Sequence, residues 1–236
     1  KMKSSSAVSE NAKNQGIAEA RFMRGLAYWY LASLWGNVIL YENTSDLVNH
    51  YVVPTNPRTD VMEFAIRDME FAAKYLPTIA SETGRINKYS AFGMLSRFYL
   101  SMAGLTTEGQ YNGTNVATNF NRGIRNPYYL NLARMAAEKV IKESDFKLMS
   151  NYASLFKIAN NNCSEDMFQL QWLTGSTDAI GWGCNQDITS FFGWSTMVSD
   201  GTNWGGATCC SWNLFNEYES SDLRRHESVA SYGDYY

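Results

Sequence analysis

The chain contains few of the residues that hold metal ions or mark common catalytic sites. Its 236 residues include two histidines and four cysteines. His50 and His226 lie far apart in the sequence, and no two cysteines have the C-x-x-C spacing of a zinc site. The chain also lacks G-x-S-x-G, H-E-x-x-H and a glycine-rich phosphate loop with its lysine. We therefore expect no metal, no cofactor and no enzymatic activity.

Charge and long apolar runs are also scarce. Charged residues make up 18% of the chain and its net charge is -3, so no basic surface for nucleic acid is indicated. The segment 25–41 carries no charge, but Gly36 and Asn37 interrupt it, and it holds three tyrosines and a serine. We conclude that this segment is not a membrane span.

Aromatic residues are abundant, and the tryptophans are concentrated in one segment. Aromatics make up 14% of the chain, and five of the seven tryptophans fall between Trp172 and Trp212. The same segment is rich in glycine and has little periodicity. Such loops are costly to order and usually carry function. Because tryptophan faces stack on flat polar ligands and Asn or Asp reads hydroxyl groups, this composition suits sugar binding.

The segment 18–40 predicts a helix that packs closely on its neighbours. Phe22, Leu26, Trp29 and Ser33 recur with helical spacing and define its expected apolar stripe. Gly25 lies among bulky residues, so we expect a neighbouring helix to approach it closely. The pair Gly36-Asn37 predicts the end of the helix, with a short extended exit at 38–40.

Apolar periodicity predicts three further helices, with Thr59 or Asp60 capping the first, Gly104 ending the second and Pro127 opening the third. Leu26 aligns with Leu95, 69 residues later, and this offset is close to two tetratricopeptide repeats. The expected elements are helices at about 59–76, 88–103 and 127–141, a short helix or turn at 151–156, and a strand at 166–172. The apolar faces expected of the three helices, in chain order, are Val61, Phe64, Ala65, Met69, Ala72 and Leu76; Ala91, Leu95, Phe98 and Met102; and Tyr129, Ala133, Ala136, Val140 and Ile141.

Four motifs in order resemble the SusD/RagB family of outer-membrane nutrient-binding lipoproteins. The first two are AEARFMRGLAYWYLASLWGNVIL and GRINKYSAFGMLSRFYL. The third runs from Asn151 through Phe156 to the acidic Glu165, and the fourth is FNEYESSDLRR, with Asp222 and Arg224. The sequence departs from the family at Asn37 and Ile39, where members often have an acidic residue and a proline.

The resemblance implies a mainly α fold, in which tetratricopeptide-like hairpins carry long irregular loops and minor β structure. It implies one domain over 1–236, incomplete at both ends, with hairpin repeats at 18–145 and a loop-rich, Trp/Gly-rich ligand-binding part at 146–236. Members of this family bind oligosaccharides or other nutrients at the surface of the outer membrane. They lie over a SusC-like TonB-dependent transporter, and a lipid anchor upstream of the present chain would hold the protein there.

The expected ligand contacts all lie in the Trp/Gly-rich segment, where aromatic platforms have polar neighbours. Trp172 and Trp212 flank regular elements and Trp29 and Trp35 belong to the opening helix, so we expect these four in the core. Two alternatives stay open, a surface glycoside hydrolase, which needs only two carboxylates, and a helical-repeat scaffold for protein partners. The expected ligand-binding residues are Trp182, Asn185, Gln186, Asp187, Trp194, Asp200, Asn203 and Trp204.

Overall fold

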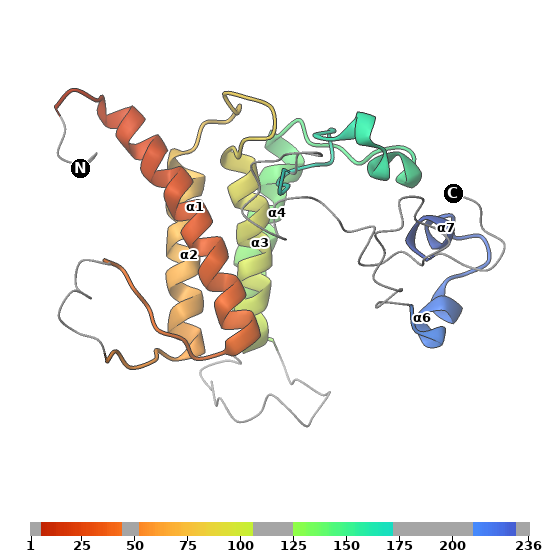
Figure 1. Cartoon of the computed structure of the whole chain (residues 1–236), viewed down its shortest axis with the longest axis horizontal. Coiled ribbons are helices and arrows are strands. Elements are labelled where there is room, and N and C mark those ends of the chain that lie inside the picture. Colours follow the sequence, from red (N-terminus) through yellow and green to blue (C-terminus); the bar gives the residue numbers. More distant parts are fainter. Residues whose placement is uncertain (1–5, 44–51, 106–124, 172–209, 230–236) are drawn as a thin grey trace, which may run out of the picture. The chain divides into compact units, whose positions relative to one another are not determined.

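The structure is a computed structural model, and it describes residues 6–43, 52–105, 125–171 and 210–229 (Figure 1). The chain divides into two compact units, Lys1–Phe146 and Lys147–Tyr236. That both units belong to one domain stays a prediction.

The first unit consists of four long helices, α1 (Glu10–Trp35), α2 (Arg58–Tyr75), α3 (Lys88–Leu105) and α4 (Pro127–Glu143). Each helix packs on the next one in the sequence, and Figure 1 shows them side by side. The described part of the second unit has only short elements. These are the 3-10 helices η2 (Tyr152–Phe156) and η3 (Ile158–Asn160), and the helices α6 (Trp212–Glu217) and α7 (Arg224–Ser228). The predicted mainly α fold with helical hairpins is confirmed.

The core of the helical unit follows most of the predicted apolar stripes. Ser33 and Ile141 are exceptions, because both are exposed. Ser33 turns away because the buried face of α1 runs instead through Gly25 and Ala32, and its hydroxyl donates to the Trp29 carbonyl at 2.7 Å. Predicted residues that are buried include Phe22, Leu26, Val61, Ala65, Met69, Ala72, Leu76, Ala91, Leu95, Phe98, Met102, Ala133, Ala136 and Val140.

The starts of α1 and α2 differ from the prediction. α1 begins at Glu10, earlier than expected, because the Ser9 hydroxyl caps it by accepting from the Ala12 amide at 3.3 Å. Thr59 and Asp60 do not cap α2, since both lie inside its first turn. Instead, the Arg58 amide donates to Asn37 Oδ1 at 3.0 Å, from the exit of α1.

Two further predictions of local structure are wrong. α3 continues through Gly104 to Leu105 instead of ending before the glycine. Residues 166–171 form no strand, and Trp172 lies outside the described residues. A turn at 163–166 precedes this segment, because the Cys163 amide donates to Asp166 Oδ2 and the Asp166 amide donates back to the Cys163 carbonyl. Within the described ranges, β structure is limited to one antiparallel bridge, Val38 to Asn56.

Gly25 lies where the backbones of α1 and α2 approach each other closely, as the sequence indicated. A Cβ atom placed there would lie 2.9 Å from the Ala65 carbonyl oxygen and 3.3 Å from Asp68 Cβ. Since the backbone of a packed helix moves only with the whole helix, Gly25→Ala should cost about 1–3 kcal/mol in the free energy of unfolding. Urea unfolding followed by circular dichroism measures this cost.

Gly104→Ala in α3 is the matched control for Gly25→Ala. The nearest atom to a Cβ at Gly104 is a guanidinium nitrogen of Arg125, at 3.3 Å, and a flexible side chain can yield. We expect Gly104→Ala to leave stability unchanged or to raise it by about 0.5–1 kcal/mol, because alanine favours helix. If the two variants unfold at the same urea concentration, the close approach at Gly25 is wrong.

No helix in the described ranges is both long enough and apolar enough to cross a membrane.

Candidate functional site

The eight residues expected to contact ligand lie at 182–204, outside the residues that the structure describes. Their role stays a prediction. The described residues offer three features that bear on function, namely a groove between α3 and α4, a set of motif carboxylates, and an exposed aromatic stack on α6.

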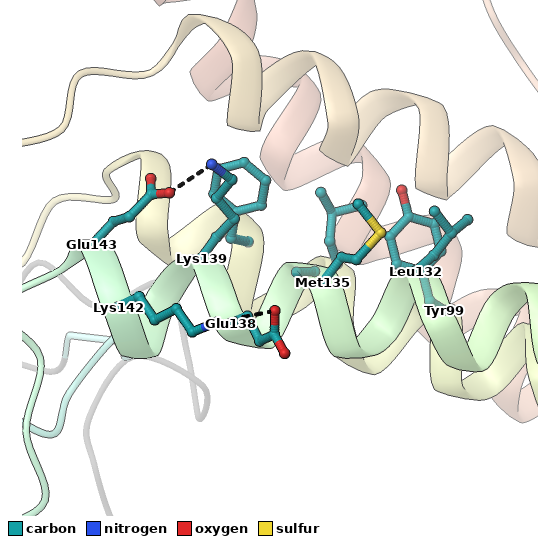
Figure 2. Close-up of a pocket in the computed structure, with 10 residues that line it drawn as sticks. Tyr99, Leu132, Met135, Glu138, Lys139, Lys142 and Glu143 are labelled. Atoms are coloured by element: carbon teal, nitrogen blue, oxygen red, sulfur yellow. Dashed lines mark hydrogen bonds and ion pairs between the residues drawn. The ribbon is translucent and has the colours of Figure 1, made fainter.

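The groove between α3 and α4 has a volume of about 400 Å³ (Figure 2). Its apolar side is formed by Phe92 and Leu95 of α3 and by Leu132, Met135 and Ala136 of α4. Apolar atoms dominate the lining. A groove of this kind suits an apolar surface better than a sugar, whose hydroxyl groups need several converging hydrogen-bond partners.

The charged residues at the rim of the groove are paired along α4. Lys139 Nζ lies 2.6 Å from Glu143 Oε1, and Lys142 Nζ lies 3.4 Å from Glu138 Oε2 (Figure 2). The hydrogen bond from Arg134, and then that from Lys142, lowers the pKa of Glu138, and the hydrogen bond to Glu143 raises the pKa of Lys139. These are exposed i,i+4 pairs, so the rim is a solvated helix face and not an arrangement for acid–base catalysis.

Tyr99 of α3 is the uncharged polar residue in the lining of the groove. It is buried, and its hydroxyl donates to Glu70 Oε1 at 2.6 Å. Burial, and then the hydrogen bond to Glu70, raises the pKa of Tyr99 well above its ordinary value. Tyr99 therefore stays protonated, and its hydroxyl ties α3 to α2.

The acidic residues of the family motifs bind backbone amides of the second unit, Glu165 at a distance in the sequence and Asp222 within its own turn. Glu165 Oε2 accepts from the Met149 amide at 2.8 Å. Asp222 Oδ1 accepts from the side chain and the backbone of Arg224, at 2.8 and 2.9 Å. The hydrogen bond from the Arg224 side chain is the largest cause that lowers the pKa of Asp222 to about 2. Both carboxylates thus have structural roles, which does not favour a hydrolase built on them.

In the part of the chain that the structure describes, no group of three or more histidines, cysteines and acidic side chains is placed to hold a metal ion.

The placement of the tryptophans corrects two expectations. Trp29 is half-buried and stacks on Phe98, but Trp35 and Trp212 are 67% and 72% exposed. Trp35 is the last residue of α1, three positions after Ala32, the last residue of that helix to be buried. Trp212 is exposed because no residue of the short helix α6 is buried.

The Trp212 side chain belongs to a stack of three side chains, with Phe215 and Arg225. Its ring is nearly parallel to that of Phe215, with an interplanar angle of 13° and 5.5 Å between centroids. The Arg225 guanidinium lies 5.3 Å from the Phe215 centroid. The sequence contained a signal for this exposure, because the flanking Ser211, Asn213 and Asn216 are polar and leave no apolar stripe long enough to bury a helix.

Comparison with known sequences agrees with the resemblance of the motifs to the SusD/RagB family. A family model described as starch-binding and associating with the outer membrane matches residues 2–100. A SusD-like protein of Bacteroides ovatus is 36% identical over 232 residues, which is 97% of this chain and 39% of that protein.

Solved structures agree in fold. A crystal structure with a xylogluco-oligosaccharide is 34% identical, with a TM-score of 0.77 over 95% of this chain and 42% of that one. A SusD-like carbohydrate-binding protein of Bacteroides fragilis is 26% identical, with a TM-score of 0.53 over 70% of this chain and 28% of that one. This chain spans about two fifths of the length of the Bacteroides ovatus protein and of the oligosaccharide-bound one. In both sequence and fold, the chain belongs to the SusD-like family.

Proposed function

We propose that this chain is part of a cell-surface protein that captures an oligosaccharide and delivers it to a SusC-like TonB-dependent transporter. The observation that carries the proposal is the likeness to the structure solved with a xylogluco-oligosaccharide, at 34% identity over 95% of the chain. The glycan would bind on the Trp/Gly-rich loops, through the eight residues named above.

The proposed location is the outer face of the outer membrane. The description of the matching family model, which names association with that membrane, supports it. A lipid anchor on a segment upstream of the present chain would hold the protein there, and the transporter would be its partner in the same membrane.

A binding assay separates the proposed function from its two alternatives. The chain is incubated with a xylogluco-oligosaccharide, followed by calorimetry and by an assay for new reducing ends. Binding without new reducing ends supports the proposal, whereas release of reducing ends supports a glycoside hydrolase. If a wider panel of glycans is neither bound nor cut, the protein-scaffold alternative gains and the proposal is wrong.

Trp182→Ala and Trp194→Ala test the placement of the ligand. Removing a stacking platform should weaken binding by about tenfold to a hundredfold, which corresponds to roughly 1–3 kcal/mol. At least one of these variants should lose affinity while keeping its melting temperature. Trp29→Ala is the contrast, because this residue packs against α3 and should affect stability instead. Normal binding by both loop variants would place the platform elsewhere.

A further inference from the structure

On α6, an exposed tryptophan stacks on a nearly parallel aromatic ring. Phe215 backs one face of the Trp212 indole, and the Arg225 guanidinium lies over the Phe215 ring. With this backing in place, 72% of Trp212 is still exposed. An indole covered on both faces could not leave so much surface open, so its other face is accessible.

The requirements of a core do not explain this arrangement. Single exposed apolar residues are common on protein surfaces, but Trp212 is also stacked on an aromatic ring that is itself in contact with a cation. α6 has six residues and buries none of them, so Trp212 is not needed to anchor the helix. Its start is stabilised by Ser211, whose hydroxyl accepts from the Leu214 amide at 3.2 Å.

The groups beside Trp212 suit a carbohydrate. Asn216 lies one helical turn after Trp212, so its amide is presented on the same side of α6, and it is exposed. An amide offers both donors and an acceptor to sugar hydroxyl groups. Trp212 also lies at the C-terminal end of the Trp/Gly-rich segment in the sequence. We propose that Trp212 is a stacking platform for a pyranose ring of the bound oligosaccharide, with Asn216 as a hydroxyl-binding neighbour.

This inference rests on the proposed function and adds to it a contact that the sequence had assigned to the core. A pyranose ring has a flat face of C–H groups that packs on an indole, while its hydroxyl groups point outward toward polar side chains. Pre-orientation by Phe215 lowers the entropic cost of binding, because the indole does not have to be ordered by the ligand. Replacing Phe215 should therefore weaken binding too, although Phe215 itself need not contact the sugar.

Isothermal calorimetry on the full chain, with a xylogluco-oligosaccharide as the probe, tests the inference. Trp212→Ala should weaken binding on the order of tenfold. Trp212→Tyr should recover part of the affinity, because it restores a flat ring. Phe215→Leu, which keeps apolar volume but removes the parallel ring, should show a smaller loss than Trp212→Ala.

Trp35→Ala is the matched control, since Trp35 is similarly exposed but lies at the end of α1. We expect it to bind the probe as the unmodified chain does. If Trp212→Ala also binds normally, or if it lowers the melting temperature without changing affinity, the platform is wrong while the proposed function stands. If the unmodified chain binds neither the probe nor any glycan of a wider panel, the proposed function fails, and this inference with it.

Discussion

Arg24→Met should lower the free energy of unfolding by about 3 kcal/mol, because it deprives a buried carboxylate of its main partner. Asp68 of α2 is 2% exposed. Arg24 of α1 donates to both of its oxygens, from Nε at 2.6 Å and from Nη2 at 2.8 Å. Arg21 is a weaker partner, with its Nη1 3.7 Å from Asp68 Oδ1, and it remains in the variant. The loss in the free energy of unfolding should therefore be at the low end for a broken buried ion pair.

Two comparisons isolate the buried charge in this prediction. Arg67→Met removes an exposed i,i+4 partner of Glu63 on α2 and should cost less than about 0.5 kcal/mol. The double variant Arg24→Met/Asp68→Leu should be clearly more stable than Arg24→Met alone, because it leaves no unpaired carboxylate. Urea unfolding of the three variants measures these differences. Equal stability of Arg24→Met and Arg67→Met would contradict the prediction.

The helical scaffold was predictable because apolar periodicity reports burial directly. The stripe of α3, which includes Leu95, Phe98 and Met102, is buried as expected. Pro127 also opens α4, with Asn126 as its cap. These signals lie within one or two helical turns of the residues that they describe, so the local sequence contains them.

Contacts between residues distant in the sequence were not predictable from local patterns. Asn37 satisfies the first amide of α2 from 21 positions away, which left Thr59 and Asp60 as misleading local candidates. Asp68 is a charged residue on an otherwise apolar face. It is buried only because Arg21 and Arg24 reach it from α1, and α2 alone gives no sign of them.

The burial of the tryptophans was likewise not predictable from the residue type alone. Tryptophan fills cores and also forms binding platforms, so its identity alone does not distinguish Trp29, which packs on Phe98, from the exposed Trp35 and Trp212. Helix length separates Trp29 from Trp212, because Trp29 lies within a long packed helix and Trp212 lies in a six-residue helix with no buried residue. It does not separate Trp29 from Trp35, which is the last residue of the same long helix.

Trp29→Ala should lower the free energy of unfolding by about 3 kcal/mol, because it removes a side chain through which α1 packs on α3. The indole stacks on the fully buried Phe98 with an interplanar angle of 4° and 5.4 Å between centroids. Its Nε1 donates to Ser101 Oγ at 3.2 Å, and the Arg97 guanidinium lies 5.3 Å from the ring. Since the indole is only half-buried, the loss in the free energy of unfolding should be at the low end of the range for replacing a large aromatic residue with alanine.

Thermal and urea unfolding of three variants tests this role. Trp29→Phe keeps the ring stack but loses the hydrogen bond to Ser101, so it should cost about 1 kcal/mol. Trp35→Ala, on the same helix but 67% exposed, should stay within about 0.5 kcal/mol of the unmodified chain. If Trp29→Ala and Trp35→Ala unfold at the same denaturant concentration, the stack on Phe98 contributes nothing to stability and the packing of α1 on α3 is wrong.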